Sequence, residues 1–346
     1  MLIKKNILKK ITMLESSKII DVIQNLNASG LKIVLVIDKK KYFIGIINDG
    51  DIRRALLKGL NINDKILSIV NRNCLISNNT ENNEEKNNIL KKNSINHIPI
   101  IKKRKILGLY IQSNNTNLPV KKIDNDVIVM AGGFGKRLGH LTKKVPKALL
   151  KFKEKPLLQH VIENAKNSGF NKFIISIFYL KKLIKIFLKN KKNLNTKIKF
   201  IEEKKPLGTI GSIKLIRKVS DNFIVINCDV ITNVDLHELL KFHKKRNAMI
   251  TIGVKHFKYQ NPYGVIISKN NKFMSFQEKP EINFNINAGI YVFNKKIIPI
   301  IKKENFKNIE DLIYYLNKKN KKILTFPIFE NWKDLGQDKK DLKRFN

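Results

Sequence analysis

Cysteine is scarce in this chain, and its scarcity excludes two classes of protein. Only Cys74 and Cys228 occur in 346 residues, and they fall in different predicted domains. A disulfide framework and a cysteine-based metal site are therefore excluded. Two isolated cysteines fit the reducing cytoplasm, where we expect the protein to work.

Long apolar runs are also missing. No stretch of about 18 uncharged apolar residues occurs, and the opening segment Met1 to Asn6 is not followed by a sustained apolar run. We therefore expect neither a membrane span nor an export signal.

Acidic residues are few: 28 Asp and Glu stand against 69 Lys and Arg, a formal net charge of +41. Such an excess can attract nucleic acid or an anionic membrane. Lys far outnumbers Arg, however, and is spread over the whole length beside abundant Ile and Asn, as in a proteome with AT-rich codons. Neither arginine clusters nor interleaved aromatic residues are present. We expect no nucleic-acid partner, although the charge should attract phosphorylated substrates.

The length of 346 residues predicts two domains rather than one. Residues 113–125 are polar, contain a proline and show no period, which is typical of a linker. We accordingly predict a first domain at 1–115, a linker at 116–125 and a second domain at 126–346.

The first half contains an internal repeat of one small α+β unit. Apolar spacing and β-branched runs predict the first copy, with helices at 16–28 and 49–58 and strands at 32–37 and 42–47. Ser16 and Asn48 are the expected N-caps of its helices. The second copy has a predicted helix at 84–92 and strands at 97–101 and 106–111.

Residues 45–53, Gly-Ile-Ile-Asn-Asp-Gly-Asp-Ile-Arg, resemble part of a CBS module, so the first half resembles a pair of these small regulatory repeats. In such modules a Thr or Ser and an Asp hold the ribose and phosphates of an adenine nucleotide. Here Asn48 stands in place of the hydroxyl residue before Asp51. The resemblance implies either an adenine nucleotide held at Asn48 and Asp51 or a structural, dimerising role.

Strand and helix patterns alternate through the second half. The predicted strands are 127–130, 173–177, 198–201, 223–227 and 249–254, and the predicted helices are 157–168, 180–189, 209–218 and 235–246. This alternation predicts an α/β, Rossmann-like domain with a mainly parallel sheet covered on both faces. Ligands then bind at the carboxyl ends of the strands.

The first of these strands runs directly into a glycine-rich, basic segment. Residues 131–138 read Ala-Gly-Gly-Phe-Gly-Lys-Arg-Leu, and Pro146-Lys147 follow. Glycines let backbone amides approach phosphate oxygens, and Arg137 and Lys147 add charge-assisted donors. The segment is neither the dinucleotide fingerprint G-x-G-x-x-G nor a Walker loop.

This segment resembles the G-G-x-G-x-R-L signature, with a later Pro-Lys pair, of the sugar-1-phosphate nucleotidyltransferases. These nucleotide-sugar pyrophosphorylases include the mannose- and glucosamine-1-phosphate guanylyltransferases. The resemblance extends over residues 126–340 and implies a GT-A-like form of the predicted sheet. It implies that Arg137 and Lys147 are catalytic. The nucleotide would be held by four residues of the loop, Ala131, Gly132, Gly133 and Gly135.

Residues 203–212, Glu-Lys-Lys-Pro-Leu-Gly-Thr-Ile-Gly-Ser, are similar to the family's base-reading loop, written L-G-T-A-G. The similarity implies base contacts from Gly208 and Glu203. A carboxylate can accept the N1–H and N2–H₂ donors of guanine together, whereas uracil or thymine offers one ring N–H. GTP is therefore the expected nucleotide, with UTP or dTTP as the alternative.

Two acidic segments resemble the family's metal site. Residues 223–229, Phe-Ile-Val-Ile-Asn-Cys-Asp, predict a buried strand that delivers Asp229 to the carboxyl edge of the sheet. Residues 331–336 are similar to the late W-x-D-x-G segment, which implies Asp334 as the second ligand. Mg²⁺ prefers oxygen ligands and binds through one or two carboxylates plus substrate phosphates. Mg²⁺ is thus the implied cofactor.

Three further segments, at residues 263–265, 278–280 and 287–289, resemble the family's sugar site. The triplet Glu278-Lys279-Pro280 resembles E-K-P, which implies Lys279 as a catalytic residue at the sugar 1-phosphate. The implied sugar contacts are Gly264, Glu278, Asn287 and Gly289.

The implied reaction is in-line attack of a sugar 1-phosphate oxygen on the α-phosphorus of the NTP, with release of pyrophosphate. Arg137 would stabilise the pyrophosphate, and Lys147 and Lys279 would fix the reacting phosphates. We expect a homo-oligomer that uses glucosamine 1-phosphate or mannose 1-phosphate, for surface-glycan or nonulosonic acid synthesis. An inactive, nucleotide-sensing CBS protein is the alternative from a different class.

Overall fold

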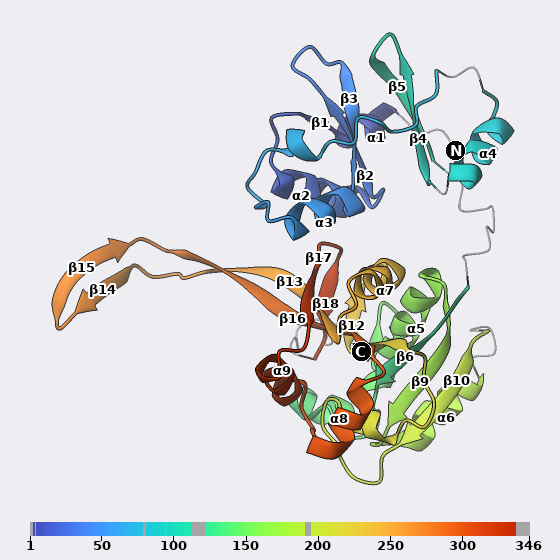
Figure 1. Cartoon of the computed structure of the whole chain (residues 1–346), viewed down its shortest axis with the longest axis vertical. Coiled ribbons are helices and arrows are strands. Elements are labelled where there is room, and N and C mark those ends of the chain that lie inside the picture. Colours follow the sequence, from blue (N-terminus) through green and yellow to red (C-terminus); the bar gives the residue numbers. More distant parts are fainter. Residues whose placement is uncertain are drawn as a thin grey trace. The chain divides into compact units, whose positions relative to one another are not determined.

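The computed structural model describes residues 3, 5–78, 81–93, 95–111, 122–190 and 195–336. Contacts within the chain divide it into two compact units, Met1–Leu118 and Pro119–Asn346 (Figure 1). Residues 116–121 of the predicted linker lie outside the described residues. In the described part of the chain, no helix has the length and apolarity needed to cross a membrane.

The first copy of the predicted repeat is a three-stranded sheet with helices. Its elements are α1 (Lys5–Lys10), β1 (Thr12–Leu14), α2 (Ile19–Ser29), β2 (Ile33–Ile37), β3 (Phe43–Asn48) and α3 (Asp49–Leu57), followed by a 3₁₀ helix, η1 (Ile66–Ile69). Strand β2 pairs in parallel with β1 and antiparallel with β3. The hairpin and both helices of this copy are confirmed, whereas β1 was not predicted.

Of the two expected helix caps, one is confirmed and one is wrong. The side chain of Asn48 accepts a hydrogen bond from the backbone N–H of Asp51 at 3.0 Å and caps α3. Ser16 does not cap α2, which begins after Lys18. Lys18 is extended because it forms a β-bridge with Lys65, and this pairing delays the start of the helix.

The second copy consists of α4 (Asn83–Asn93) and the hairpin β4 (His97–Lys102) and β5 (Lys105–Ile111), as predicted. Its small core joins Leu90 of the helix to Ile98, Ile100 and Tyr110 of the hairpin. The first unit is therefore built from small sheets and helices.

The second unit is centred on a seven-stranded sheet of order β10-β9-β6-β11-β16-β13-β17. Its strands are β6 (Ile123–Met130), β9 (Phe170–Ile177), β10 (Lys197–Glu202), β11 (Asn222–Asn227), β13 (Ile250–Gln260), β16 (Glu281–Asn294) and β17 (Ile323–Ile328). Only the pairings of β16 with β11 and β13 are antiparallel; the other four are parallel. The predicted mainly parallel α/β sheet is confirmed.

Helices cover both faces of this sheet. Its helices are α5 (Leu157–Asn167), α6 (Lys181–Asn190), α7 (Leu236–Lys245), α8 (Ile297–Glu304) and α9 (Ile309–Lys318). The first three pack in one core and the last two in another. Neighbouring residues of β11 alternate between the cores, since Ile224 belongs to the first and Val225 to the second. Alternation of this kind is the period of a strand buried on both sides.

The predicted helix at 209–218 is wrong. A short 3₁₀ helix, η5 (Gly211–Leu215), stands there instead. Ile210, Ile213 and Ile216 are buried in the second core and recur every three residues. That spacing places them on one side of a 3₁₀ helix, which has three residues per turn.

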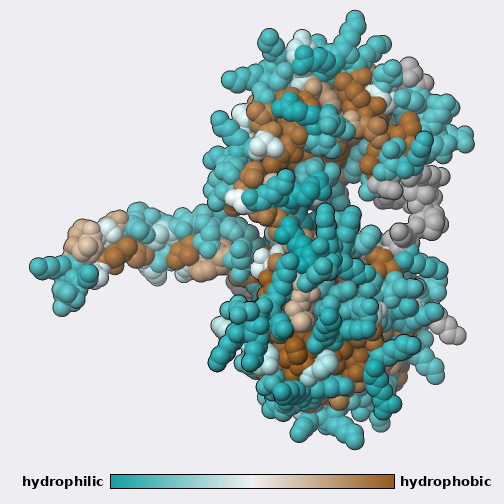
Figure 2. All heavy atoms as spheres, in the orientation of Figure 1, coloured by the Kyte–Doolittle hydropathy of each residue, from teal (hydrophilic) through white to brown (hydrophobic). Residues whose placement is uncertain are grey.

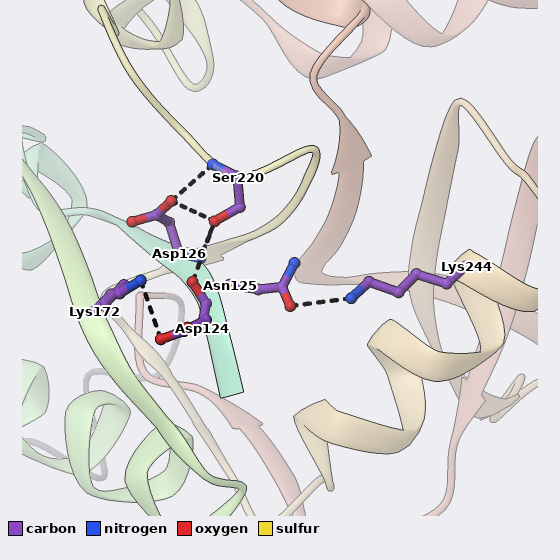
Figure 3. Close-up of polar contacts among 6 residues, drawn as sticks. All are labelled: Asp124, Asn125, Asp126, Lys172, Ser220 and Lys244. Atoms are coloured by element: carbon purple, nitrogen blue, oxygen red, sulfur yellow. Dashed lines mark hydrogen bonds and ion pairs between the residues drawn. The ribbon is translucent and has the colours of Figure 1, made fainter. Parts of the chain in front are cut away.

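Strand β6 begins at Ile123, inside the segment expected to be a linker. Figure 3 shows the contacts that hold the first residues of this strand. The Asp126 carboxylate accepts hydrogen bonds from the backbone N–H and the hydroxyl of Ser220, at 2.8 and 2.6 Å. The Asn125 side chain contacts Lys244 of α7 at 3.0 Å. These contacts fix the amino end of the strand.

Two long strands extend beyond the sheet as an arm. Strands β13 and β16 continue outward and carry the hairpin β14 (Val265–Lys269) and β15 (Lys272–Gln277) at their end (Figure 1). We call residues 255–286 the arm. Shorter elements complete the unit. They are the 3₁₀ helices η2 (Lys136–Thr142) and η3 (Lys147–Leu149) and two pairs of short strands, β7 (Lys151–Phe152) with β8 (Lys155–Pro156) and β12 (Val230–Thr232) with β18 (Trp332–Asp334).

Candidate active site

A pocket of about 370 Å³ opens where β6 and β11 end. Its wall is formed by the glycine-rich loop, Lys147, the loop at 203–209, the end of β11 and Asn308. This is the carboxyl edge at which the sequence predicts ligand binding. A larger cavity of about 490 Å³ lies around Asn222 and Lys322, at the amino end of β11, and contains no predicted site residue.

The glycine-rich loop presents bare backbone to the pocket. A Cβ added to Gly133 would meet no atom within 4 Å, whereas one added to Gly132 would lie 2.7 Å from Oε1 of Glu203. Gly135 has a φ of 65°, which favours glycine. Ala131 is buried and fixes the start of the loop, because its N–H donates to the Ser176 carbonyl at 2.9 Å.

Three charged side chains converge beside this loop. Lys147 Nζ forms an ion pair with Asp229 Oδ2, and both side chains are largely buried. A Cβ on Gly336 would lie under 3.0 Å from Lys147 Nζ, Asp229 Oδ2 and Asp334 Oδ1. Because Gly336 has no side chain, there is space beside it for the Lys147 ammonium group and the carboxylates of Asp229 and Asp334 to meet.

The pairing of two short strands, β12 and β18, holds Asp229 and Asp334 close together. In the β12–β18 ladder Val230 lies opposite Asp334, and the N–H of Leu335 donates to the Asp229 carbonyl at 3.1 Å. The Gly336 N–H donates to Asp334 Oδ1 at 2.7 Å. The metal pair expected from two distant segments is thus brought to one place.

Burial raises the pKa of Asp334 above the usual aspartate value, and the charge of Asp229 raises it further. The Gly336 N–H, Lys147 and Arg137 act in the opposite direction. In the described part of the chain, no group of three or more His, Cys, Asp or Glu residues is arranged to hold a metal ion. A cation here would rely on these two carboxylates and on oxygens supplied by a ligand.

Glu203 is buried and joins three segments of the site. Its Oε1 accepts from the Ser176 hydroxyl at 2.8 Å, and its Oε2 accepts from the N–H of Leu207 at 2.9 Å. Oε1 also lies against Gly132. The carboxylate therefore fixes the loop at 203–208 against β9 and the glycine-rich loop.

Gly208 holds the same loop against the segment before α9. Its φ is 83°, and a Cβ there would lie 2.5 Å from the Lys307 carbonyl oxygen. The N–H of Ile309 donates to the Thr209 hydroxyl at 3.0 Å. Only glycine fits at position 208, because both the backbone conformation and the space exclude a side chain.

The structure divides the predicted sugar residues into two groups. Gly289 contacts Asn227 at the end of β11, and the N–H of Gly289 donates to the Asn287 side chain at 3.0 Å, so both lie beside the pocket. Gly264, Glu278 and Lys279 lie on the arm, between the long strands β13 and β16 and the hairpin β14–β15, and none of the three lines the pocket.

Lys279 and Glu278 form a loose pair on the arm. Lys279 Nζ and Glu278 Oε1 are 3.8 Å apart, and both side chains are more than half exposed. Arg137 is likewise exposed, on η2.

The pocket-lining residues that sequence reasoning missed include Phe134, Asn227 and Asn308. Asn227 had a signal, since it ends a strand two residues before Asp229. Phe134 packs its ring against Phe178 at 5.4 Å between centroids. Asn308 had no local signal, because only the packing of α9 brings it to the pocket.

In the first unit, Asn48 and Asp51 serve the start of α3. Asp51 Oδ2 accepts from the Asn48 N–H at 3.0 Å, and Oδ1 is paired with Arg54. Both carboxylate oxygens of Asp51 thus have partners within this helix.

Residues 126–344 match the protein family described as Nucleotidyl transferase. The catalytic subunit beta of mannose-1-phosphate guanylyltransferase from Xenopus tropicalis is 32% identical over 221 residues, and the mannose-1-phosphate guanyltransferase of Saccharomyces cerevisiae is 32% identical over 222. Each alignment covers 61% of this chain and 61% of the relative. The chain therefore spans about three fifths of the length of these relatives.

Solved structures show the same fold. HddC from Yersinia pseudotuberculosis is similar with a TM-score of 0.50 and 26% identity, over 64% of this chain and 100% of that chain. A putative glucose-1-phosphate thymidylyltransferase from Bacillus anthracis has a TM-score of 0.50 and 21% identity, over 63% of this chain and 92% of its own.

Proposed function

The chain belongs to the nucleotidyl transferase family, and from this premise we propose that it transfers GMP from GTP to a sugar 1-phosphate and releases pyrophosphate. One observation carries the proposal: Lys147, Asp229 and Asp334 converge beside a pocket that Glu203 and Gly208 also line. A phosphate-binding loop, an acidic pair and a base-binding loop at one sheet edge are what the reaction requires.

The triphosphate would lie along the glycine-rich loop. The open space at Gly133 lets phosphate oxygens reach backbone amides, and Arg137 and Lys147 supply positive charge. In-line displacement needs positioned reactants and compensated charge, and no protein nucleophile. Arg137 would stabilise the leaving pyrophosphate.

Asp229 and Asp334 would hold Mg²⁺. The fit rests on the chemistry of the pair: two carboxylates meet, one with a raised pKa, and a single lysine balances only part of their charge. Mg²⁺ accepts such oxygen donors together with phosphate oxygens, and when bound it supplies neutralising charge to the triphosphate. Lys147 would then exchange Asp229 for a phosphate oxygen.

Guanine would be read at Glu203 and Gly208. Each carboxylate oxygen of Glu203 accepts one internal hydrogen bond and keeps a second acceptor site for the N1–H and N2–H₂ of guanine. The relatives named as mannose-1-phosphate guanylyltransferases support GTP over UTP or dTTP.

The same relatives favour mannose 1-phosphate as the acceptor, with glucosamine 1-phosphate as the second candidate. Asn287 and Gly289 would contact the sugar, and Lys279 its phosphate. We propose that the reaction occurs in the reducing cytoplasm, where Cys74 and Cys228 would stay free thiols. We further propose that its product serves surface-glycan or nonulosonic acid synthesis.

For residues 1–115 we propose a CBS-like pair with a structural role. Asn48 and Asp51 already bond to each other's backbone at the start of α3, which leaves an adenine nucleotide a poor grip. Titration of the full chain with AMP, ADP and ATP in a calorimeter should give no binding heat from this unit. Binding that Asp51→Asn abolishes would contradict the structural role.

The function is tested by incubating the full chain with Mg²⁺, each of GTP, UTP, dTTP, ATP and CTP, and a panel of sugar 1-phosphates. Pyrophosphate release and the mass of the nucleotide sugar are measured. We expect turnover with GTP and mannose 1-phosphate. Absence of turnover with every pair would sink the proposal and favour the nucleotide-sensing alternative.

A further inference from the structure

The base of the arm has one apolar face. Phe257 pairs with Phe284 and Tyr259 with Ile282 across β13 and β16, so these four side chains lie on the same side. Each is between 43 and 49% exposed. The alternate pairs on the other side, such as His256 with Asn285, are polar. The arm is thus amphipathic like a sheet that covers something.

The tip of the arm repeats this arrangement. Ile266 lies opposite Phe276, and Phe273 lies opposite Ser268 on the same side of β14. These three apolar side chains are 55 to 66% exposed. Figure 2 shows apolar residues gathered along the arm between hydrophilic ones.

The exposed apolar area is enough for a stable interface. The seven apolar side chains named above are about half exposed, and at roughly 150–250 Å² for a fully buried aromatic side chain they offer on the order of 600–900 Å² together. A standard protein interface buries about 800 Å² on each partner. A two-stranded ribbon is also only marginally stable alone in water.

Paired strands hold the base of the arm to the central sheet of its own chain. Seven consecutive cross-strand pairs, from Val254–Asn287 to Gln260–Glu281, make its base a direct continuation of the central sheet. Lys255 Nζ also donates to the carbonyls of Phe329 and Glu330, at 3.1 and 3.0 Å. Because β16 is antiparallel to both β11 and β13, the base leaves the sheet at the same edge as the pocket and extends outward as a paired ribbon (Figure 1). Six strand residues, about 20 Å at roughly 3.4 Å per residue, separate Glu281 from Asn287, and Lys279 lies beyond Glu281.

We propose that the arm completes the sugar site of a second copy of this chain. The arm of one copy would bring its Lys279 and Glu278 to the sugar side of the other copy's pocket, beside Asn287 and Gly289, and the apolar face of that arm would pack on the body of the other copy. Two identical arms exchanged in this way form a closed, two-fold symmetric dimer. The inference rests on the proposed function for the role of Lys279.

The test is complementation between two variants. Asp229→Asn inactivates the body of one chain and Lys279→Ala the arm of another; the two are co-expressed with different tags, and dimers that carry both tags are purified. Each variant alone should be inactive. The mixed dimer pairs one intact body with one intact arm, so it should show about half of the wild-type kcat per dimer.

A matched control uses two body variants, Asp229→Asn with Lys147→Met, which should not complement in any arrangement. If the Asp229→Asn and Lys279→Ala dimer is inactive while the wild type turns over, the arm serves its own chain and the inference is overturned.

A second measurement keeps the inference separable from the reaction. Sedimentation should show a wild-type dimer at micromolar concentration. Phe257→Lys with Phe284→Lys should weaken the dimer at least 100-fold, whereas His256→Lys with Asn285→Lys, on the opposite face of the same ladder, should leave it intact. If the wild type turns over nothing but sediments as this dimer, only the proposed function fails. A monomeric wild type would overturn the arm exchange whatever the activity.

Discussion

Asp229 Oδ2 and Asp334 Oδ1 both lie less than 3.0 Å from the position that a Cβ atom on Gly336 would occupy. The β12–β18 ladder brings them there from segments that are distant in the chain. Burial and this proximity raise the pKa of Asp334, because its negative charge is unfavourable beside a second carboxylate. A divalent cation would remove that cost, and this relationship underlies the first prediction.

Asp229→Asn and Asp334→Asn should each lower kcat/KM by about 10²- to 10³-fold, the usual effect of removing one charge-stabilising group. Steady-state pyrophosphate release measures the loss. Chelation of Mg²⁺ should abolish wild-type turnover reversibly. Asp221→Asn is the control, since Asp221 is exposed beside the amino end of β11. Full turnover by Asp229→Asn at saturating Mg²⁺ and GTP would show that the metal assignment is wrong.

Gly133→Ala and Gly132→Ala should separate binding from stability. At Gly133 a methyl group meets no protein atom, so Tm should stay the same or rise slightly, with up to about 1 kcal/mol added to the free energy of unfolding. The KM for GTP should rise at least about tenfold, because the methyl group enters the space of the phosphates. At Gly132 the methyl lies 2.7 Å from Glu203 Oε1, so Tm should fall. Thermal melting and GTP kinetics test both. An unchanged KM in Gly133→Ala would place the phosphates elsewhere.

Glu203→Gln should weaken both the loop and the preference for guanine. A Gln amide cannot accept hydrogen bonds at both of its atoms, so either Ser176 or Leu207 loses its acceptor, at a cost of about 1–3 kcal/mol. The ratio of kcat/KM for GTP to that for UTP should fall. Glu202→Gln is the control, because Glu202 forms exposed pairs with lysines that contribute little. An unaltered ratio would remove Glu203 as the base reader.

His243 should make the protein less stable in mild acid. Desolvation by burial lowers its pKa from 6.5 to about 4, and its ring contacts Thr251 and Asn222. The unfolded chain takes up the proton first, so stability is full above pH 6.5 and falls by up to about 3 kcal/mol as the pH drops toward 4.

Urea unfolding of the wild type and of His243→Gln across this pH range tests the effect. The variant should lose this part of the pH dependence, although its stability at neutral pH is lower. His237→Gln, on the same helix, should keep the wild-type slope. Equal slopes for His243→Gln and the wild type would contradict the prediction.

The sheet of the second unit was largely readable from local patterns. Apolar runs such as Phe223 to Asn227 are buried on both faces, and a strand of this kind shows itself as a continuous apolar run. Strand β16 was missed because its first half, on the arm, is exposed and polar at alternate positions. The apparent helix at 209–218 was misread because a three-residue repeat can resemble a helical period over a short span.

By itself, the sequence determined the order of the strands along the chain and the loops that follow them. In a mainly parallel sheet the carboxyl ends of the strands share one edge, and the glycine-rich loop, Glu203 and Asp229 all follow strands. These residues therefore lie together at that edge. Only the tertiary structure decided which side chains meet. Strand register and the packing of distant segments put Asp334 beside Asp229 and Asn308 at the pocket, and they put Lys279 on the arm, outside the residues that line the pocket. Local periodicity carries no information about such long-range pairings.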